Sequence, residues 1–150
     1  MELALSVEQM KHLKELGVDI SKASMWWCRI VRPACPPKKE KVMVDWFLST
    51  HKEQMHTGLD VVETIPAFIL NDILNLLPKY IYDEQSGYHA NLCIDYEREK
   101  ILYGRTDGYG IEVWHGEYMS DDLTETAYRM LCWCVDNRYV ETIENDKKVN

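Results

Sequence analysis

Residues Asp121–Asn137 read DDLTETAYRMLCWCVDN, and this stretch decides how the rest of the chain is interpreted. Its apolar residues recur at the spacing of a single helical face, and they are Leu123, Ala127, Met130, Leu131 and Cys134. Asp121 and Asp122 offer N-capping oxygens and negative charge to the first turn, and β-favouring residues follow Asn137. The stretch therefore predicts one amphipathic helix that covers a sheet.

Two shorter helices are predicted ahead of it. Ser6 and Gln9 form a capping box for a helix that ends near Gly17, a residue type common just after a helix. The second helix is predicted over Leu70–Leu77, where leucine and isoleucine share one face and a proline follows. The stretch 49–65 has no clear period, and we expect a long loop there.

Four stretches after the middle helix have the alternation of antiparallel strands, and they are 80–82, 88–96, 100–103 and 111–115. Asp107-Gly108 suits a tight turn before the last of them. An edge strand is expected over 139–143, before a polar tail over 144–150 that frays. With a hairpin near the N-terminus, these elements predict a single α+β domain over residues 1–150. We expect one mainly antiparallel sheet of about five to six strands, packed by about three helices.

Charge divides the chain into two unlike halves. Residues 1–79 hold ten Lys and Arg against ten Asp and Glu, whereas residues 80–150 hold seven against fifteen, which accounts for the net charge of −8. All nine tyrosines also lie in the second half. An acidic, tyrosine-rich surface repels phosphate backbones and attracts basic protein surfaces. We therefore expect a protein partner and no direct contact with nucleic acid.

Composition also predicts the compartment and the absence of bound groups. The sequence has no basic leader and no apolar run of roughly 18 residues, so we expect a cytoplasmic, intracellular protein with no membrane contact. The five cysteines include no Cys-x-x-Cys motif, which favours reduced thiols. The histidines include no His-x-x-x-His pair, so we expect neither a metal nor a cofactor.

Three stretches look familiar as a set: SVEQMKHLKELGVD at 6–19, PAFILNDILNLLPK at 66–79 and AYRMLCWCVDNRYVET at 127–142. They resemble small uncharacterised proteins encoded by phages and integrated mobile elements of gut bacteria. The shared residues are core and cap positions, so the resemblance implies a genomic setting and no activity. In that group a threonine often starts the middle helix, whereas Ile69 stands at that place here.

No set of residues has the spacing of a known reaction, and three residues are fallback candidates for acid-base catalysis. Asp95, His115 and Glu117 lie on or near predicted strands that could gather them in one cleft. His89 and Cys93 share a strand face ~13 Å apart, so a dyad with Cys93 would need His115 instead. A small hydrolase or nucleotide-binding enzyme is thus an alternative, and a solvated sheet face is the simpler interpretation.

The predicted first hairpin, formed by 24–32 and 42–48, is apolar on both faces. Strand alternation places one apolar set away from the face of Trp26 and Trp46, and that set is Met25, Trp27, Val31, Met43 and Phe47. If no helix covers it, Trp27, Met43 and Phe47 form a patch suited to a homodimer or to a host protein.

These patterns together favour a non-enzymatic, protein-binding accessory or inhibitory protein of phage or mobile-element origin. Such proteins act by docking on another protein, which needs a surface but no catalytic spacing. A structural virion component is a further alternative.

Overall fold

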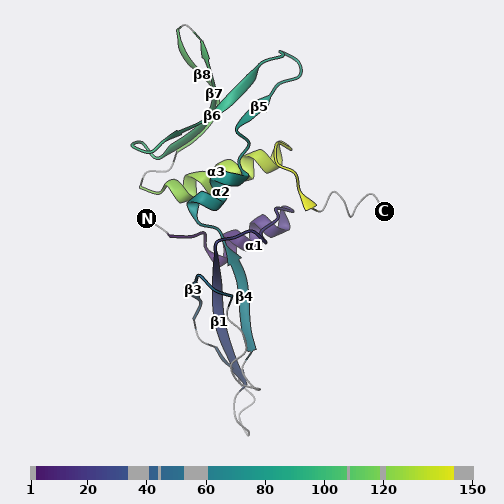
Figure 1. The fold of residues 1–150 in the computed structure, drawn as a ribbon, viewed down its shortest axis with the longest axis vertical. Coiled ribbons are helices and arrows are strands. Elements are labelled where there is room, and N and C mark those ends of the chain that lie inside the picture. Colours follow the sequence, from purple (N-terminus) through teal and green to yellow (C-terminus); the bar gives the residue numbers. More distant parts are fainter. Residues whose placement is uncertain are drawn as a thin grey trace, which may run out of the picture.

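A computed structural model describes residues 3–33, 41–43, 45–52, 61–107, 109–118 and 121–143. In these ranges the chain is α+β, as predicted. Two antiparallel sheets lie toward opposite ends of an elongated molecule, with three helices between them (Figure 1). The expectation of one sheet of about five to six strands is therefore wrong. The middle helix separates the strands that precede it from those that follow, and each group pairs only within itself.

The first sheet is built around β1 (Met25–Pro33). Two short strands, β2 (Lys41–Met43) and β3 (Phe47–Ser49), pair antiparallel with successive parts of β1, and β4 (Val61–Ala67) pairs with it over seven residues. The long loop expected over 49–65 is thus wrong at Ser49, which ends β3, and from residue 61 onward, and residues 53–60 lie outside the described ranges. β4 is rich in β-branched residues, which favour an extended chain, and its single proline is tolerated because β4 pairs only with β1.

One extra residue in the returning chain changes which side chains share a face of this sheet. Val31 pairs with Met43 and Cys28 pairs with Phe47, so three steps along β1 correspond to four steps along the return. An extra residue of this kind inverts the face of everything that follows it. Phe47 therefore shares a face with Cys28 and not with Trp27.

Helix α1 (Val7–Glu15) begins with the predicted capping box. The Ser6 hydroxyl accepts the Gln9 N–H at 3.1 Å, and the Gln9 side-chain carbonyl accepts the Ser6 N–H at 2.9 Å. These two bonds satisfy main-chain donors that a helix start otherwise leaves unpaired. The apolar side of α1 is buried, and the Gln9 amide also donates to Glu125 on the last helix.

Helix α2 (Leu70–Leu76) confirms the predicted middle helix and begins without a side-chain cap from Ile69. The Asp72 carboxylate substitutes by accepting the Ile69 N–H at 3.0 Å. The same carboxylate accepts the N–H and the hydroxyl of Ser24, just before β1. One side chain therefore stabilises the start of α2 and ties it to the first sheet.

The second sheet is a meander of β5 (Tyr80–Tyr82), β6 (His89–Asp95), β7 (Lys100–Asp107) and β8 (Gly110–Tyr118). Its strands confirm the predicted ones, with β7 and β8 longer than expected. A bulge interrupts the last ladder, because Tyr103 pairs with His115 while the next residue, Gly104, pairs with Val113. Trp114 is the additional residue on β8.

Helix α3 (Leu123–Asp136) confirms the predicted covering helix. The Asp122 carboxylate caps it by accepting the N–H groups of Thr124 and Glu125 at 3.0 and 3.2 Å. The five apolar residues predicted for its packing face are all buried, and α3 lies against β7, β8 and α2. Within the described ranges, no helix has the length and apolar character needed to cross a membrane.

The segment after α3 does not form the edge strand expected over 139–143. Arg138 adopts a φ of +63° and turns the chain, and the N–H of Ile143 then donates to the carbonyl of Gly17 at 2.9 Å. Gly17 has a φ of +89°, and a Cβ there would lie only 2.9 Å from Thr142 Cβ. The segment is therefore held against the turn after α1, and not at a sheet edge.

Replacing Met130, which is fully buried, by alanine is expected to lower the free energy of unfolding by roughly 2–5 kcal/mol, because it leaves a cavity beneath the second sheet. Urea denaturation followed by tryptophan fluorescence measures the change. Asp136→Ala on the exposed side of the same helix serves as a control, with an expected change within about 0.5 kcal/mol. Equal stability of the Met130→Ala variant and the unchanged protein would contradict this packing.

Gly104→Ala is expected to lower the free energy of unfolding by about 1–3 kcal/mol through overpacking. The added Cβ would lie 2.8 Å from Ile111 Cγ2 and 3.1 Å from the main-chain oxygen of Glu112, and the latter cannot move aside cheaply. Gly116→Ala on the same sheet face is the matched control, since its Cβ would meet the flexible end of Lys100 at 3.3 Å. Thermal melts that show equal losses for the two variants would argue against a rigid bulge.

Candidate functional site

The second sheet has one face against the helices, and none of the helices in the described part of the chain lies over its other face (Figure 1). Strand register assigns Ile81, Ala90, Ile101 and Tyr103 to the inner face, and all four are at most 3% exposed. Side chains on neighbouring positions point to the other side, because they alternate along a strand. We call that other side the open face.

The open face is uncharged over most of its area. Its uncharged strand positions are Tyr80, Tyr82, His89, Asn91, Cys93, Leu102, Gly104, Thr106, Ile111, Val113, Gly116 and Tyr118. Large side chains on its two outer strands are well exposed, with values of 47–61% for Tyr80, Tyr82, Ile111 and Val113. Among the strand positions that the register assigns to this face in the described residues, the charged ones are Asp95 and Lys100, which pair at one end. Tyrosine enrichment without charge is the composition that distinguishes the centre of a protein interface from ordinary surface.

Acidic residues occupy the turns that border the open face. Asp83 and Glu84 lie between β5 and β6, and Glu97 and Glu99 lie between β6 and β7. Arg98 is the single basic residue in these two turns. The open face is therefore an apolar, tyrosine-containing centre with a mainly negative perimeter.

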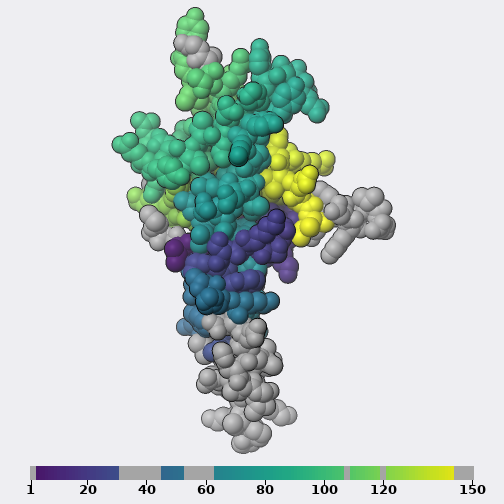
Figure 2. Space-filling model, viewed as in Figure 1, coloured from purple at the N-terminus to yellow at the C-terminus, as the bar shows by residue number. Residues whose placement is uncertain are grey.

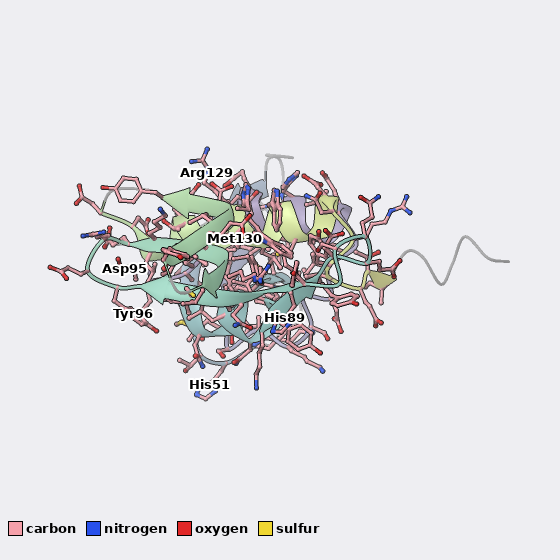
Figure 3. All side chains as sticks on the ribbon, turned by 90° about the horizontal axis from the view of Figure 1, so that it is seen from above. His51, His89, Asp95, Tyr96, Arg129 and Met130 are labelled. Carbon is pink, nitrogen blue, oxygen red and sulfur yellow. The ribbon has the colours of Figure 1, made fainter. Side chains whose placement is uncertain are left out.

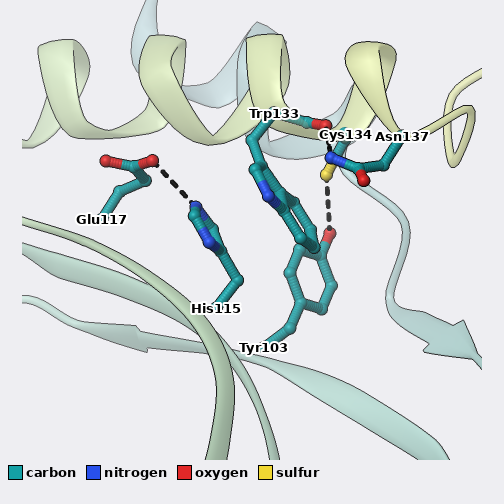
Figure 4. Close-up of polar contacts among 6 residues, drawn as sticks. All are labelled: Tyr103, His115, Glu117, Trp133, Cys134 and Asn137. Atoms are coloured by element: carbon teal, nitrogen blue, oxygen red, sulfur yellow. Dashed lines mark hydrogen bonds and ion pairs between the residues drawn. The ribbon is translucent and has the colours of Figure 1, made fainter.

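His115 and Glu117 are the two catalytic candidates that the structure brings together. Nε2 of His115 lies 2.8 Å from Oε1 of Glu117 (Figure 4). Both side chains are half-buried and face α3, where the imidazole stacks on the indole of Trp133 with ring centroids 4.0 Å apart and planes at 2°. The pair could exchange a proton, but its arrangement is also that of a packed contact between β8 and α3.

Asp95, the third candidate, lies on the opposite side of the sheet. Its register with Lys100 places it on the open face, at the other end of β6 from His89 (Figure 3). The Asp95 carboxylate accepts the N–H of Arg98 at 3.1 Å. Cys93 is also on the open face, so it cannot form a dyad with His115. The structure thus joins two of the three candidates and separates the third.

Trp27 of the first sheet is half-buried against the segment before α1. Its indole N–H donates to the carbonyl of Leu5 at 2.7 Å, and its ring lines a shallow apolar pocket with Leu3 and Leu48. Phe47 is 38% exposed on the other face. The single patch predicted from Trp27, Met43 and Phe47 therefore does not form, because the extra residue before β3 reverses Phe47.

The same reversal affects Trp46, which was expected beside Trp26. Cζ of Arg29 lies 4.5 Å from the centroid of the Trp46 ring, and Arg29 shares the face of Trp27. Met25 of the predicted patch is half-buried at the start of β1. Met43 and Val31 pair in register, and their side chains lie outside the described part of the structure.

Burial keeps two thiols on α3 and one phenol on β7 protonated. Burial raises the pKa of the Cys132 and Cys134 thiols to about 11. It also raises the pKa of the Tyr103 hydroxyl well above its usual value, and that hydroxyl donates to the carbonyl of Pro78 at 2.7 Å. These groups are therefore uncharged at neutral pH. Among the described residues, no three His, Cys, Asp or Glu side chains are placed to share a metal ion.

No protein-family model, curated protein or solved structure matches this chain.

The open face was only partly predicted from the sequence, as a solvated face of β6. Its outer members, such as Tyr82 and Val113, can be assigned only when the register of β5 and β8 is known.

In the folded protein, Cys93 is expected to react with iodoacetamide before Cys28 and Cys134, which have no exposed surface. Burial also raises the pKa of the Cys134 thiol, which lowers its fraction of thiolate, the reactive form, at pH 8. Peptide mass mapping at successive times measures the order. Cys93→Ser should remove the early adduct on that peptide, and equally early labelling of Cys134 would contradict the packing of α3.

Proposed function

We propose that this chain is a non-enzymatic, protein-binding accessory or inhibitory protein that docks on another protein through the open face. The observation that carries the proposal is the uncharged, tyrosine-containing centre of that face. Tyrosine and aliphatic side chains on a rigid sheet lose little conformational freedom on binding. Covering them would gain about 25 cal/mol for each Å² of apolar surface removed from water.

The acidic turns support a partner with a basic surface. Residues 80–150 carry the whole net charge of −8, and four of the acidic residues lie in the two turns beside the open face. A complementary partner has an apolar patch with lysine and arginine around it. Charge complementarity of this kind raises the association rate and discourages wrong partners.

The resemblance of residues 6–19, 66–79 and 127–142 to phage and mobile-element proteins supports a bacterial host protein as the partner. An accessory or inhibitory protein of such an element needs no catalytic centre. The contact of His115 with Trp133 is consistent with that role, because a stacked imidazole also stabilises the packing of β8 on α3.

A photo-crosslinking amino acid at position 82 or 113 is expected to capture a basic host protein from lysate, whereas the same group at Tyr139 is not. Tyr82 and Val113 lie on the open face, and Tyr139 is an exposed aromatic residue beyond α3, somewhat less accessible than Tyr82. Cross-linked products are identified by mass spectrometry, and their yield should fall as salt is raised.

Paired substitution by Tyr82→Glu and Val113→Glu should weaken binding of the captured protein by roughly 30-fold or more, as expected for loss of interface anchors. Tyr139→Glu adds the same type of charge elsewhere and should leave the affinity unchanged. Equal capture from positions 82 and 139, or equal affinity of the two variants, would refute docking through the open face. Capture of a second copy of this chain alone would replace the host partner with a homodimer.

A further inference from the structure

The second sheet divides into two hairpins at one end. The ladder between β6 and β7 stops at the pair Asn91 and Gly104. Beyond it, β6 remains paired with β5 through Ala90, and β7 remains paired with β8 through Arg105. Figure 2 shows the two hairpins as separate teal and green projections with a notch between them. Main-chain groups beside the notch are therefore not used in a β6–β7 ladder.

A guanidinium group is held in this split. Cζ of Arg105 lies 3.5 Å from the centroid of the Tyr88 ring, which is cation–π stacking distance. Both residues line one pocket together with Gly87, His89, Asn91 and Thr106. His89 is itself oriented by an edge-on contact with Tyr80, with ring centroids 5.6 Å apart. The pocket is thus a polar opening at the border of the open face.

Arg105 forms no ion pair with any residue that the structure describes. Glu112 stands opposite it in the β7–β8 register but makes no contact within ion-pair distance. Stacking on an aromatic ring leaves the in-plane N–H groups of arginine available as a rigid fork, which fits a carboxylate with two parallel hydrogen bonds. The Asn91 amide and the Thr106 hydroxyl can complete the shell of donors.

We propose that this split is a carboxylate-binding site, in which Arg105 receives an acidic side chain or the C-terminal carboxylate of the docked partner. This inference rests on the proposed function, since His89 and Asn91 belong both to the pocket and to the open face. A singly charged carboxylate fits better than a phosphate, because the pocket has one arginine and lies in the half of the chain that carries the net charge of −8. A second negative charge on the ligand would be repelled by that half. The partner therefore combines a basic perimeter with one buried carboxylate.

Titration of the isotope-labelled protein with benzoate, followed by NMR, tests the site without the partner. Benzoate should shift the Arg105 side-chain N–H and the main-chain signals of Asn91 and Thr106, and neutral benzamide should not. Arg105→Gln should weaken benzoate binding at least tenfold. Arg98→Gln removes the same charge from the turn at the other end of the sheet and should leave binding unchanged.

Further ligands distinguish a side-chain carboxylate from a C-terminal carboxylate, and further variants control for misfolding. N-acetylglutamate amide and N-acetylalanine distinguish a side chain from a chain terminus, and phenyl phosphate should bind no more tightly than benzoate. Tyr88→Leu and Arg105→Lys should weaken binding to a smaller degree, and they replace Arg105→Gln if that variant loses its dispersed spectrum. Equal shifts with benzamide, or unchanged binding in the Arg105 variants, would overturn the carboxylate site. Docking through Tyr82 and Val113 would then still stand or fall by its own cross-linking test.

Discussion

The contact between α3 and the inner face of the second sheet is the interaction on which the rest of the structure depends. Met130, Leu131 and Cys134 are completely buried in it, together with Tyr103 of β7. The Tyr103 hydroxyl donates to the carbonyl of Pro78, which follows the end of α2, so the same contact also fixes α2. Through α2 and its Asp72 carboxylate the first sheet is held as well. Because the helices cover one side of each of these strands, the other side remains available.

The helices could be predicted because their signals are local. The capping residues Ser6, Gln9 and Asp122 act within one turn, and the apolar face of α3 repeats every three to four residues. β4 was missed because its side chains do not alternate in polarity, although β-branched residues fill it. Phe47 was placed on the wrong face because a single added residue between β2 and β3 reverses every later side chain, and no local pattern reveals that insertion.

In the candidate site too, contacts within one strand could be predicted from the sequence, whereas contacts that depend on strand pairing could not. His115 and Glu117 are two apart on one strand, so their shared face follows from the sequence alone. Whether Asp95 lies on the same face of the sheet as His115 and Glu117 depends on the register of β6 with β7. The spacing of residues along the chain does not reveal that register. Arg105 and Tyr88 meet only because two hairpins diverge between them. Pairing at long range therefore decides the chemistry of this surface, while spacing along the chain decides its helices.

An exposed, uncharged sheet face beside the nine-residue edge strand β8 would ordinarily favour aggregation of identical chains. The acidic turns around it counter this tendency, since two copies that meet face to face would bring Asp83, Glu84, Glu97 and Glu99 against like charges. The same turns attract a basic surface within a Debye length of about 8 Å at physiological salt. The negative perimeter thus repels a second copy of the chain and attracts a basic partner. The bulge at Trp114 adds to this, because it strengthens the local twist and leaves β8 a poorer template for another strand.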